Sequence, residues 1–250
     1  MGEIRAVSAR EGKLIRSLSV KKYRDETGLF VAEGRKVIEP MLPFFDLQLL
    51  ISSSPWSQID PEKQRTATGL ELKKLSALTT PASEIALFRV PSSDTLLSKN
   101  DHLLVALDAV QNPGNLGTII RLCDWLGIRS LILGEGTADP FSPKVVQATA
   151  GALGNVNLFK SDGLTDFIRK QAFDQVLGTS LDGLPVGQMS DLSGKGRTLV
   201  LFGNEGHGLS PELKALCTSL VLIPSAGTTV SESLNVSISA AILLSRLSGL

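Results

Sequence analysis

Cysteine and histidine are scarce in this chain, and its charges cancel. The 250 residues include two cysteines and two histidines, and 25 Lys and Arg side chains balance 25 Asp and Glu, so the formal net charge is zero. Cys123 and Cys217 lie far apart and outside any metal-binding spacing, which excludes a disulfide framework and a zinc site and fits a reducing compartment. Because the chain has no net positive charge, a nucleic acid would have to be held by a local basic patch.

Long apolar runs are missing as well. No stretch approaches the ~20 residues that cross a bilayer, and residues 1–13 are charged where a signal peptide is apolar. We therefore expect a cytoplasmic protein with no membrane partner and no bound metal. The composition that remains, 42% hydrophobic and 20% charged, is that of an ordinary globular protein rather than a disordered one.

The pattern along the chain predicts two domains of the α/β class. FVAEGRKVIEPMLP indicates a strand followed by a helix, and the basic excess over the first 40 residues is explained by a solvent-exposed helix face. Residues 93–100, rich in polar residues, form the expected linker between a small domain at 1–92 and a larger one at 101–250. In the larger domain near-continuous apolar strands alternate with helices, which predicts a mostly parallel sheet covered on both faces.

Unusual residues follow several of these strands, and parallel sheets bind ligands beyond the carboxyl ends of their strands. QNPGNLGTIIR follows one strand and GNEGHG, residues 203–208, follows another. The glycine order GxxGxG differs from the dinucleotide motif GxGxxG, so the glycines more plausibly allow close backbone approach to a ligand or another segment. His207 is expected to be a surface or stacking residue.

Hydroxyls and amides crowd the last strand-to-helix junction, IPSAGTTVSESLNVS. One helix cap needs one such side chain, whereas this junction offers Thr228, Thr229, Ser231, Ser233, Asn235 and Ser237. The crowding indicates a binding site, with N-capping as the structural alternative. In the helix after QNP, Asn115 and Arg121 are six positions apart and hence ~120° apart around the axis. An arginine among apolar residues usually pairs with a phosphate or a carboxylate, and a structural salt bridge is the alternative.

Three of these motifs together resemble a known family. NPGNLGTIIRLCDWLG, LVLFGNEGHGLS and IPSAGTTVSESLNVSISAAILL are similar to motifs 1, 2 and 3 of the SpoU (TrmH-type) RNA 2′-O-ribose methyltransferases of the SPOUT superfamily, over residues 101–250. KKYRDETGLFVAEGRKVIE also resembles the small RNA-binding domain, of ribosomal-protein L30e-like shape, that precedes this catalytic domain in several members. Three ordered motifs at fitting separations are far more specific than any one of them.

The resemblance implies a C-terminal α/β trefoil knot, which is an exception to the rule that connections do not thread loops. It implies S-adenosyl-L-methionine as cofactor, a homodimer, and methylation of a ribose in structured RNA. Ribosomal RNA is favoured over transfer RNA as the substrate. Matched position by position, the cofactor-binding residues are Thr179, Leu201, Gly203, Asn204, Ile223 and Leu234. The polar active-site positions match Asn115, Arg121, Glu205, Ser233 and Asn235.

Within that set, Arg121 would act as the base or orient a phosphate and the attacking oxygen. Glu205 would hold Arg121, while Ser233 and Asn235 would fix the ribose and the helix start. The link between Gly227 and Ser233 is about two residues longer than is usual in the family, which puts the local geometry of this loop in question. The alternative function is an inactive RNA-binding homologue with the same fold.

Overall fold

The computed structural model describes residues 4–92, 97–98, 100–188, 196–227 and 230–249, and these divide into two compact units. The first unit comprises residues 1–92 and 139–154, and the second comprises 93–138 and 155–250. The sequence places the segment 139–154 in one continuous domain with the rest of 101–250, whereas its contacts group it with the first unit. Part of the expected linker, residues 93–96 and 99, lies outside the described residues, as do Thr228 and Thr229.

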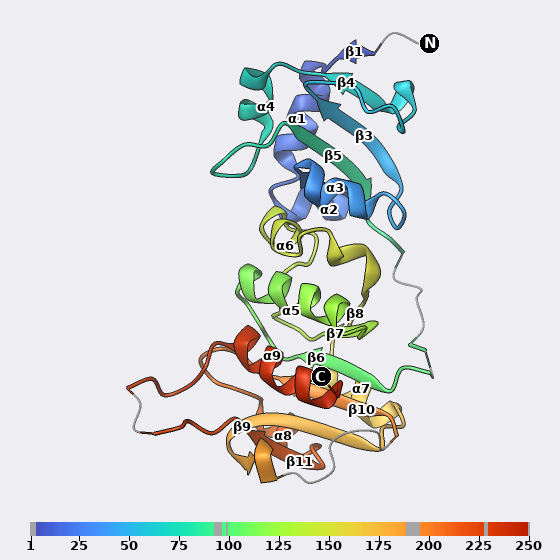
Figure 1. Cartoon of the computed structure of the whole chain (residues 1–250). Coiled ribbons are helices and arrows are strands. Elements are labelled where there is room, and N and C mark those ends of the chain that lie inside the picture. Colours follow the sequence, from blue (N-terminus) through green and yellow to red (C-terminus); the bar gives the residue numbers. More distant parts are fainter. Residues whose placement is uncertain (1–3, 93–96, 99, 189–195, 228–229, 250) are drawn as a thin grey trace. The chain divides into compact units, whose positions relative to one another are not determined.

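The first unit is built on a mixed five-stranded sheet of order β1-β4-β3-β5-β2. Figure 1 labels four of its strands, β1, β3, β4 and β5. Strand β5 is antiparallel to β2 and β3, while β4 is parallel to β1 and β3. The strands are β1 (Arg5–Ala6), β2 (Leu29–Glu33), β3 (Leu47–Ser52), β4 (Gln64–Thr66) and β5 (Glu84–Arg89). The helices are α1 (Ala9–Ser17), α2 (Lys21–Thr27), α3 (Arg35–Met41), α4 (Gly69–Leu75) and α6 (Pro143–Ala148), with a 3₁₀ turn η1 at Pro61–Lys63.

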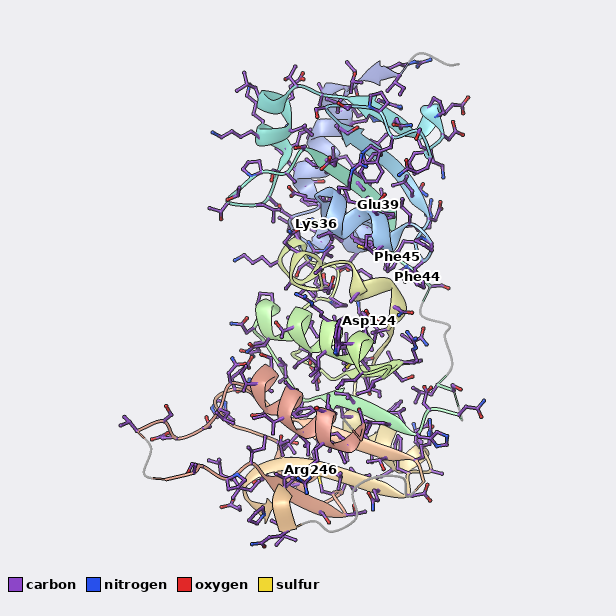
Figure 2. The ribbon with its side chains drawn as sticks, viewed as in Figure 1. Lys36, Glu39, Phe44, Phe45, Asp124 and Arg246 are labelled. Carbon is purple, nitrogen blue, oxygen red and sulfur yellow. The ribbon has the colours of Figure 1, made fainter. Side chains whose placement is uncertain are left out.

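Local sequence explains where two of these helices begin. Ser8 caps α1 and Thr68 caps α4, and in each case a glutamate three residues later, Glu11 or Glu71, returns the hydrogen bond to the cap backbone. Such reciprocal capping satisfies two N–H groups that the first helical turn leaves unpaired. Helix α3 carries Lys36 and Glu39, and Phe44 and Phe45 lie in the loop after it (Figure 2).

The interpretation of the N-terminal basic residues as one solvated helix face is wrong for Arg24, whose side chain is only 4% exposed. Its guanidinium donates to the Asp139 carboxylate at 3.0 and 2.7 Å and to the Leu18 carbonyl at 2.6 Å. The Phe141 ring packs against that of Phe30 with centroids 5.0 Å apart. These contacts explain why residues 139–154 belong to the first unit.

The second unit is built on a six-stranded, all-parallel sheet of order β11-β9-β10-β6-β7-β8. Its strands are β6 (Leu103–Leu107), β7 (Ser130–Leu133), β8 (Asn157–Lys160), β9 (Gln175–Pro185), β10 (Thr198–Phe202) and β11 (Ser219–Leu222). Its helices are α5 (Pro113–Trp125), α7 (Leu164–Lys170), α8 (Pro211–Lys214) and α9 (Val236–Leu247), with a 3₁₀ turn at Val186–Gln188. A further 3₁₀ turn, Ala152–Asn155, begins in the first unit and ends at the first residue of the next segment of the second. The predicted α/β class and parallel sheet are confirmed.

Burial follows the apolar strands of this sheet. Leu104–Leu107 and Leu199–Phe202, in adjacent central strands, have no solvent exposure. Strands covered on both faces read as continuous apolar runs.

Among the described residues no helix is long and apolar enough to span a membrane. The threading of the C-terminal segment into a trefoil knot stays a prediction of the family resemblance.

Candidate active site

The loops after β6 and β10 meet where the winding of the parallel sheet reverses. From β6 the chain continues to β7 and β8 on one side, whereas β10 and β9 lie on the other side. Open parallel sheets bind ligands at such a switch point, beyond the carboxyl ends of the strands. Beside it lies a cleft of about 970 Å³ formed by the ends of β9, β10 and β11, residues 231–235 and the start of α9.

Most of the predicted site residues line this cleft: Thr179, Gly203, Asn204, Glu205, Ile223, Ser233, Leu234 and Asn235. Leu201 does not, because its side chain is buried in the sheet core. It touches the site only through its carbonyl, which accepts a hydrogen bond from the Thr179 hydroxyl at 3.1 Å. Leu201 is therefore a support for the wall of the cleft rather than part of its surface.

Gly203 ends β10 where the chain turns back on itself. A Cβ atom at this position would lie 2.2 Å from the Gly208 carbonyl carbon and 2.3 Å from the Leu209 nitrogen. Asn204 and Gly208 exchange backbone hydrogen bonds at 2.9 and 3.0 Å, which closes the tight loop. The expectation that these glycines allow close backbone approach is confirmed for Gly203.

A chain of side-chain amides links the three motifs. Asn235 Nδ2 donates to Asn115 Oδ1 at 3.0 Å, and Asn115 Nδ2 donates to Glu205 Oε1 at 3.0 Å. Asn235 Oδ1 accepts from the Ser237 N–H at 2.9 Å, so Asn235 is the N-cap of α9. The carboxylate can only accept and the helix N–H can only donate, which fixes the orientation of both amides between them.

Glu205 is held by the start of α5. Besides Asn115, the backbone N–H groups of Gln111 and Asn112 donate to its carboxylate at 3.4 and 3.3 Å. Partial burial acts to raise the pKa of Glu205, but hydrogen bonds from the Asn115 side chain and from backbone N–H groups outweigh it. The pKa of this carboxyl therefore lies below its usual value, and the group stays ionised as a hydrogen-bond acceptor.

Arg121 lies apart from this chain. It is exposed on the same face of α5 as Thr118 and Trp125 and makes no hydrogen bond or ion pair with any residue that the structure describes. The hypothesis that Glu205 holds Arg121 is wrong, because Glu205 is engaged by Asn115 and the loop backbone. The structural salt bridge is absent from the described residues too, which leaves the guanidinium available to an anion from outside the unit.

Sequence reasoning missed three residues that build the site. Asn112 caps α5, with its Oδ1 accepting from the Gly114 N–H at 2.8 Å. An Asn followed by Pro at the first helical position signals such a cap. Asp108 accepts from the Ser210 N–H at 3.0 Å. Ala109, at φ 54°, presents its carbonyl to Asn204 Nδ2 at 2.9 Å. No local pattern marks Asp108 or Ala109, because their partners lie about a hundred residues later.

Asn204 orients His207. Since Asn204 Nδ2 is committed to the Ala109 carbonyl, its Oδ1 accepts from the backbone N–H groups of Gly206 and His207 at 2.9 and 3.2 Å. The His207 ring Nδ1 lies 3.3 Å from the same oxygen. The ring is exposed at the cleft, in agreement with a surface or stacking residue.

Among the described residues no three His, Cys, Asp or Glu side chains are grouped to hold a metal ion.

Comparison with known proteins supplies the family. The SpoU rRNA Methylase family model matches residues 102–245, and the MRM3-like substrate binding domain model matches residues 11–85. The chain is 29% identical to the 23S rRNA (guanosine(2553)-2′-O)-methyltransferase RlmP of Bacillus subtilis strain 168, over the full length of both. It is 35% identical to the 23S rRNA (guanosine-2′-O-)-methyltransferase RlmB of Acinetobacter baylyi, covering 60% of this chain and 61% of the relative.

Solved structures agree over nearly the whole chain. An RNA methyltransferase of the TrmH family from Porphyromonas gingivalis, itself described as putative, superposes with a TM-score of 0.87 at 37% identity, covering 96% of this chain and 98% of that one. An rRNA methyltransferase from Sinorhizobium meliloti with bound AdoMet superposes with a TM-score of 0.82 at 31% identity, covering 97% and 95%. The chain therefore belongs to the SpoU rRNA methylase family and carries an MRM3-like substrate-binding domain ahead of the catalytic one.

Proposed function

We propose that this protein transfers a methyl group from S-adenosyl-L-methionine to a ribose 2′-oxygen of ribosomal RNA in the cytoplasm. Relatives that align over the whole chain or most of it are named as 23S rRNA 2′-O-methyltransferases. The observation that carries the proposal is the chain Asn235–Asn115–Glu205, which joins all three family motifs beside the cleft. Ribosomal RNA is preferred over transfer RNA on the strength of those relatives.

The size and the lining residues of the cleft fit S-adenosyl-L-methionine. Its volume of about 970 Å³ lies at the upper end of the ~300–1,000 Å³ typical of small-molecule sites. Ile223 and Leu234 offer apolar side chains, Thr179 offers a hydroxyl, and Gly203 lets the backbone itself form the wall. When bound there, S-adenosyl-L-methionine supplies a methyl group already activated by its sulfonium.

The protein's task is then to hold and orient the ribose. Asn115 and Glu205 form a fixed set of polar groups at the switch point, and such preorganised groups lower a barrier because they need no rearrangement during reaction. Arg121 orients the RNA phosphate next to the reacting hydroxyl, since a guanidinium keeps its proton in proteins and bonds phosphate bidentately. Ser233 is placed at the cleft to contact the ribose.

The exposed face that carries Arg121 is the proposed dimer surface. Helices α5 and α9 pack against each other, and Trp125 on α5 is 83% exposed, while Ile238 and Ile242 on α9 are 50% and 42% exposed. Arg246 lies at the end of the same helix (Figure 2). Large apolar side chains rarely gather on a monomer's surface. A second copy covering them would bring Arg121 to the edge of the joint site.

Two measurements test the proposal. Isothermal titration with S-adenosyl-L-methionine and S-adenosylhomocysteine should show saturable binding, and sedimentation velocity should show a dimer that Trp125→Lys converts to a monomer. The alternative function is an inactive RNA-binding homologue. No cofactor binding, either to the free protein or in the presence of ribosomal RNA, would favour that alternative.

A further inference from the structure

The first unit contains a second, smaller pocket that the methyl-transfer site does not use. It has a volume of about 230 Å³ and lies between α1, the end of β2 and the residues after α4. Ile15, Val31 and Leu75 give it an apolar wall, and Glu33 lies at its base. The volume falls below the ~300–1,000 Å³ of a whole cofactor site, so it suits a ligand of one or two rings.

Glu33 is an unusual residue to find in such a place, because its side chain is only 3% exposed. The Ala77 N–H donates to Oε1 at 2.8 Å, and the Ser76 hydroxyl donates to Oε2. Charged side chains are almost never fully buried without partners, and these two bonds supply them. An ionised carboxylate has about four acceptor positions, so two remain for a ligand that donates hydrogen bonds.

The mouth of the pocket carries the opposite charge. Arg16 on α1 and Lys74 on α4 both line it and both are exposed. Ser19 also lines the pocket and is exposed. The pocket thus combines acceptors at the base, an apolar wall and cations at the mouth. A ligand that matches all three has N–H donors on a flat ring and an anionic group attached to it.

We propose that this pocket takes one unpaired nucleotide of the RNA substrate, with its base inside and its phosphate at Arg16 and Lys74. RNA is read by sequence mainly at unpaired bases, which enter pockets and are bonded on their Watson–Crick edges. Guanine offers adjacent N–H donors at N1 and N2, whereas uracil offers one N–H between two acceptors. Glu33 therefore selects guanine over uracil. This inference rests on the proposed function, in that the ligand is part of a ribosomal RNA.

The test measures binding of the full chain to short RNA probes. Fluorescein-labelled hexanucleotides UGUGUG and UUUUUU are titrated with protein and followed by anisotropy. We expect UGUGUG to bind about tenfold more tightly than UUUUUU, because a bidentate contact to one base gives discrimination of this size. Glu33→Gln should remove this preference, because the amide keeps an oxygen for the Ala77 N–H but places an N–H donor where the second carboxylate oxygen was.

Neighbouring residues provide matched controls. Lys74→Ala and Arg16→Ala should weaken binding of both probes and lower its salt dependence, since they contact phosphate. Lys73→Ala is the control for Lys74→Ala, and Arg10→Ala is the control for Arg16→Ala. Each removes an exposed cation from the same helix but outside the pocket, and should leave binding unchanged. With ribosomal RNA as substrate, Glu33→Gln should raise KM and leave kcat unaltered.

The outcomes separate the two proposals. Equal affinity of Glu33→Gln and the unaltered protein for UGUGUG, or no saturable binding of either probe, would overturn the nucleotide pocket while leaving methyl transfer untouched. A guanine preference that depends on Glu33, found in a protein that forms no 2′-O-methyl product, would instead contradict the proposed function and keep the pocket as an RNA-binding site.

Discussion

Asn235 donates from Nδ2 to Asn115 Oδ1 at 3.0 Å, joining the N-terminus of α9 to that of α5 across 120 residues of sequence. Each of the two amides has its other end committed, Asn115 to Glu205 and Asn235 to the first turn of its own helix. The direction of every bond in the chain is therefore set. A substitution at any one of Asn235, Asn115 and Glu205 therefore disturbs the hydrogen bonds of the other two.

Asn235→Asp separates the capping role of this residue from its role in the chain. Aspartate caps a helix as well as asparagine does, so the contribution of the cap to the free energy of unfolding should be kept. The new carboxylate oxygen would face Asn115 Oδ1, and turning the Asn115 amide would only move the clash to Glu205. We expect methyl transfer to fall at least tenfold, which corresponds to a loss of about 1.4 kcal/mol.

Asn235→Ala is the companion variant, because it loses the cap as well, at a cost of about 1 kcal/mol in stability. The pair is compared by urea unfolding and by methyl-transfer rate. If Asn235→Asp kept full activity, the amide chain would have no part in the reaction.

Gly203→Ala should abolish cofactor binding. Its Cβ would lie 2.2 to 2.4 Å from backbone atoms of Gly208 and Leu209, so the loop that walls the cleft must move. Overpacking of this kind costs about 1–3 kcal/mol of stability. Gly187→Ala is the matched control, as a Cβ there meets nothing within 4 Å. Calorimetric titration checks both variants, and cofactor affinity of Gly203→Ala within twofold of the unaltered protein would contradict the placement of the site.

Glu205 should make stability depend on pH in the acid range. Its pKa in the folded protein lies below the ordinary value, so the ionised carboxylate stabilises the fold above the pKa of an unfolded glutamate. That contribution is lost as the pH falls through the lower, folded-state pKa. Glu205→Gln cannot ionise, and its stability difference from the unaltered protein should shrink as the pH falls from about 6 to about 3. Urea unfolding measures it, and a constant difference would refute the assignment.

The buried pair Arg24–Asp139 should hold residues 139–154 in the first unit. The two side chains are 4% and 13% exposed, and breaking such a pair leaves an uncompensated charge. Asp139→Ala should therefore cost about 3 kcal/mol. Lys21→Ala, which removes an exposed pair with Asp25, should cost less than about 0.5 kcal/mol. Thermal unfolding compares the two, and equal small shifts would show that the pair is not a stabilising contact.

The parallel sheet and its helices could be predicted because β6, β7, β10 and β11 are short apolar runs bounded by polar loops. The strands β1 and β4 were missed, since Arg5–Ala6 and Gln64–Thr66 are too short to show a pattern. The burial of Arg24 was missed for another reason. Its partner Asp139 is more than a hundred residues away, and basic residues close by in the sequence suggest a solvated surface.

In the site, too, the sequence identified residues but not the contacts between them. Residues such as Gly203, Asn115 and Asn235 could be found because they stand in motifs whose order is specific. Which of them bond to one another could not: the motifs led to Arg121 as the partner of Glu205, and no local pattern marks Asn115, 90 residues away, as its partner. The structure favours Asn115, as the first turn of α5 carries its side chain toward the loop after β10. Arg121, nearly two turns on, faces away.

The measurement that tests the central claim most directly is mass spectrometry of nucleosides from unmodified ribosomal RNA incubated with the protein and S-adenosyl-L-methionine. We predict one 2′-O-methylated nucleoside, which is absent when Arg121→Ala replaces the unaltered protein and still present with Lys170→Ala, an exposed cation on α7. Calorimetry should show that Arg121→Ala binds the cofactor nearly as well as before. Ribosomal RNA recovered without any 2′-O-methyl nucleoside, from a protein that binds the cofactor, would contradict the account.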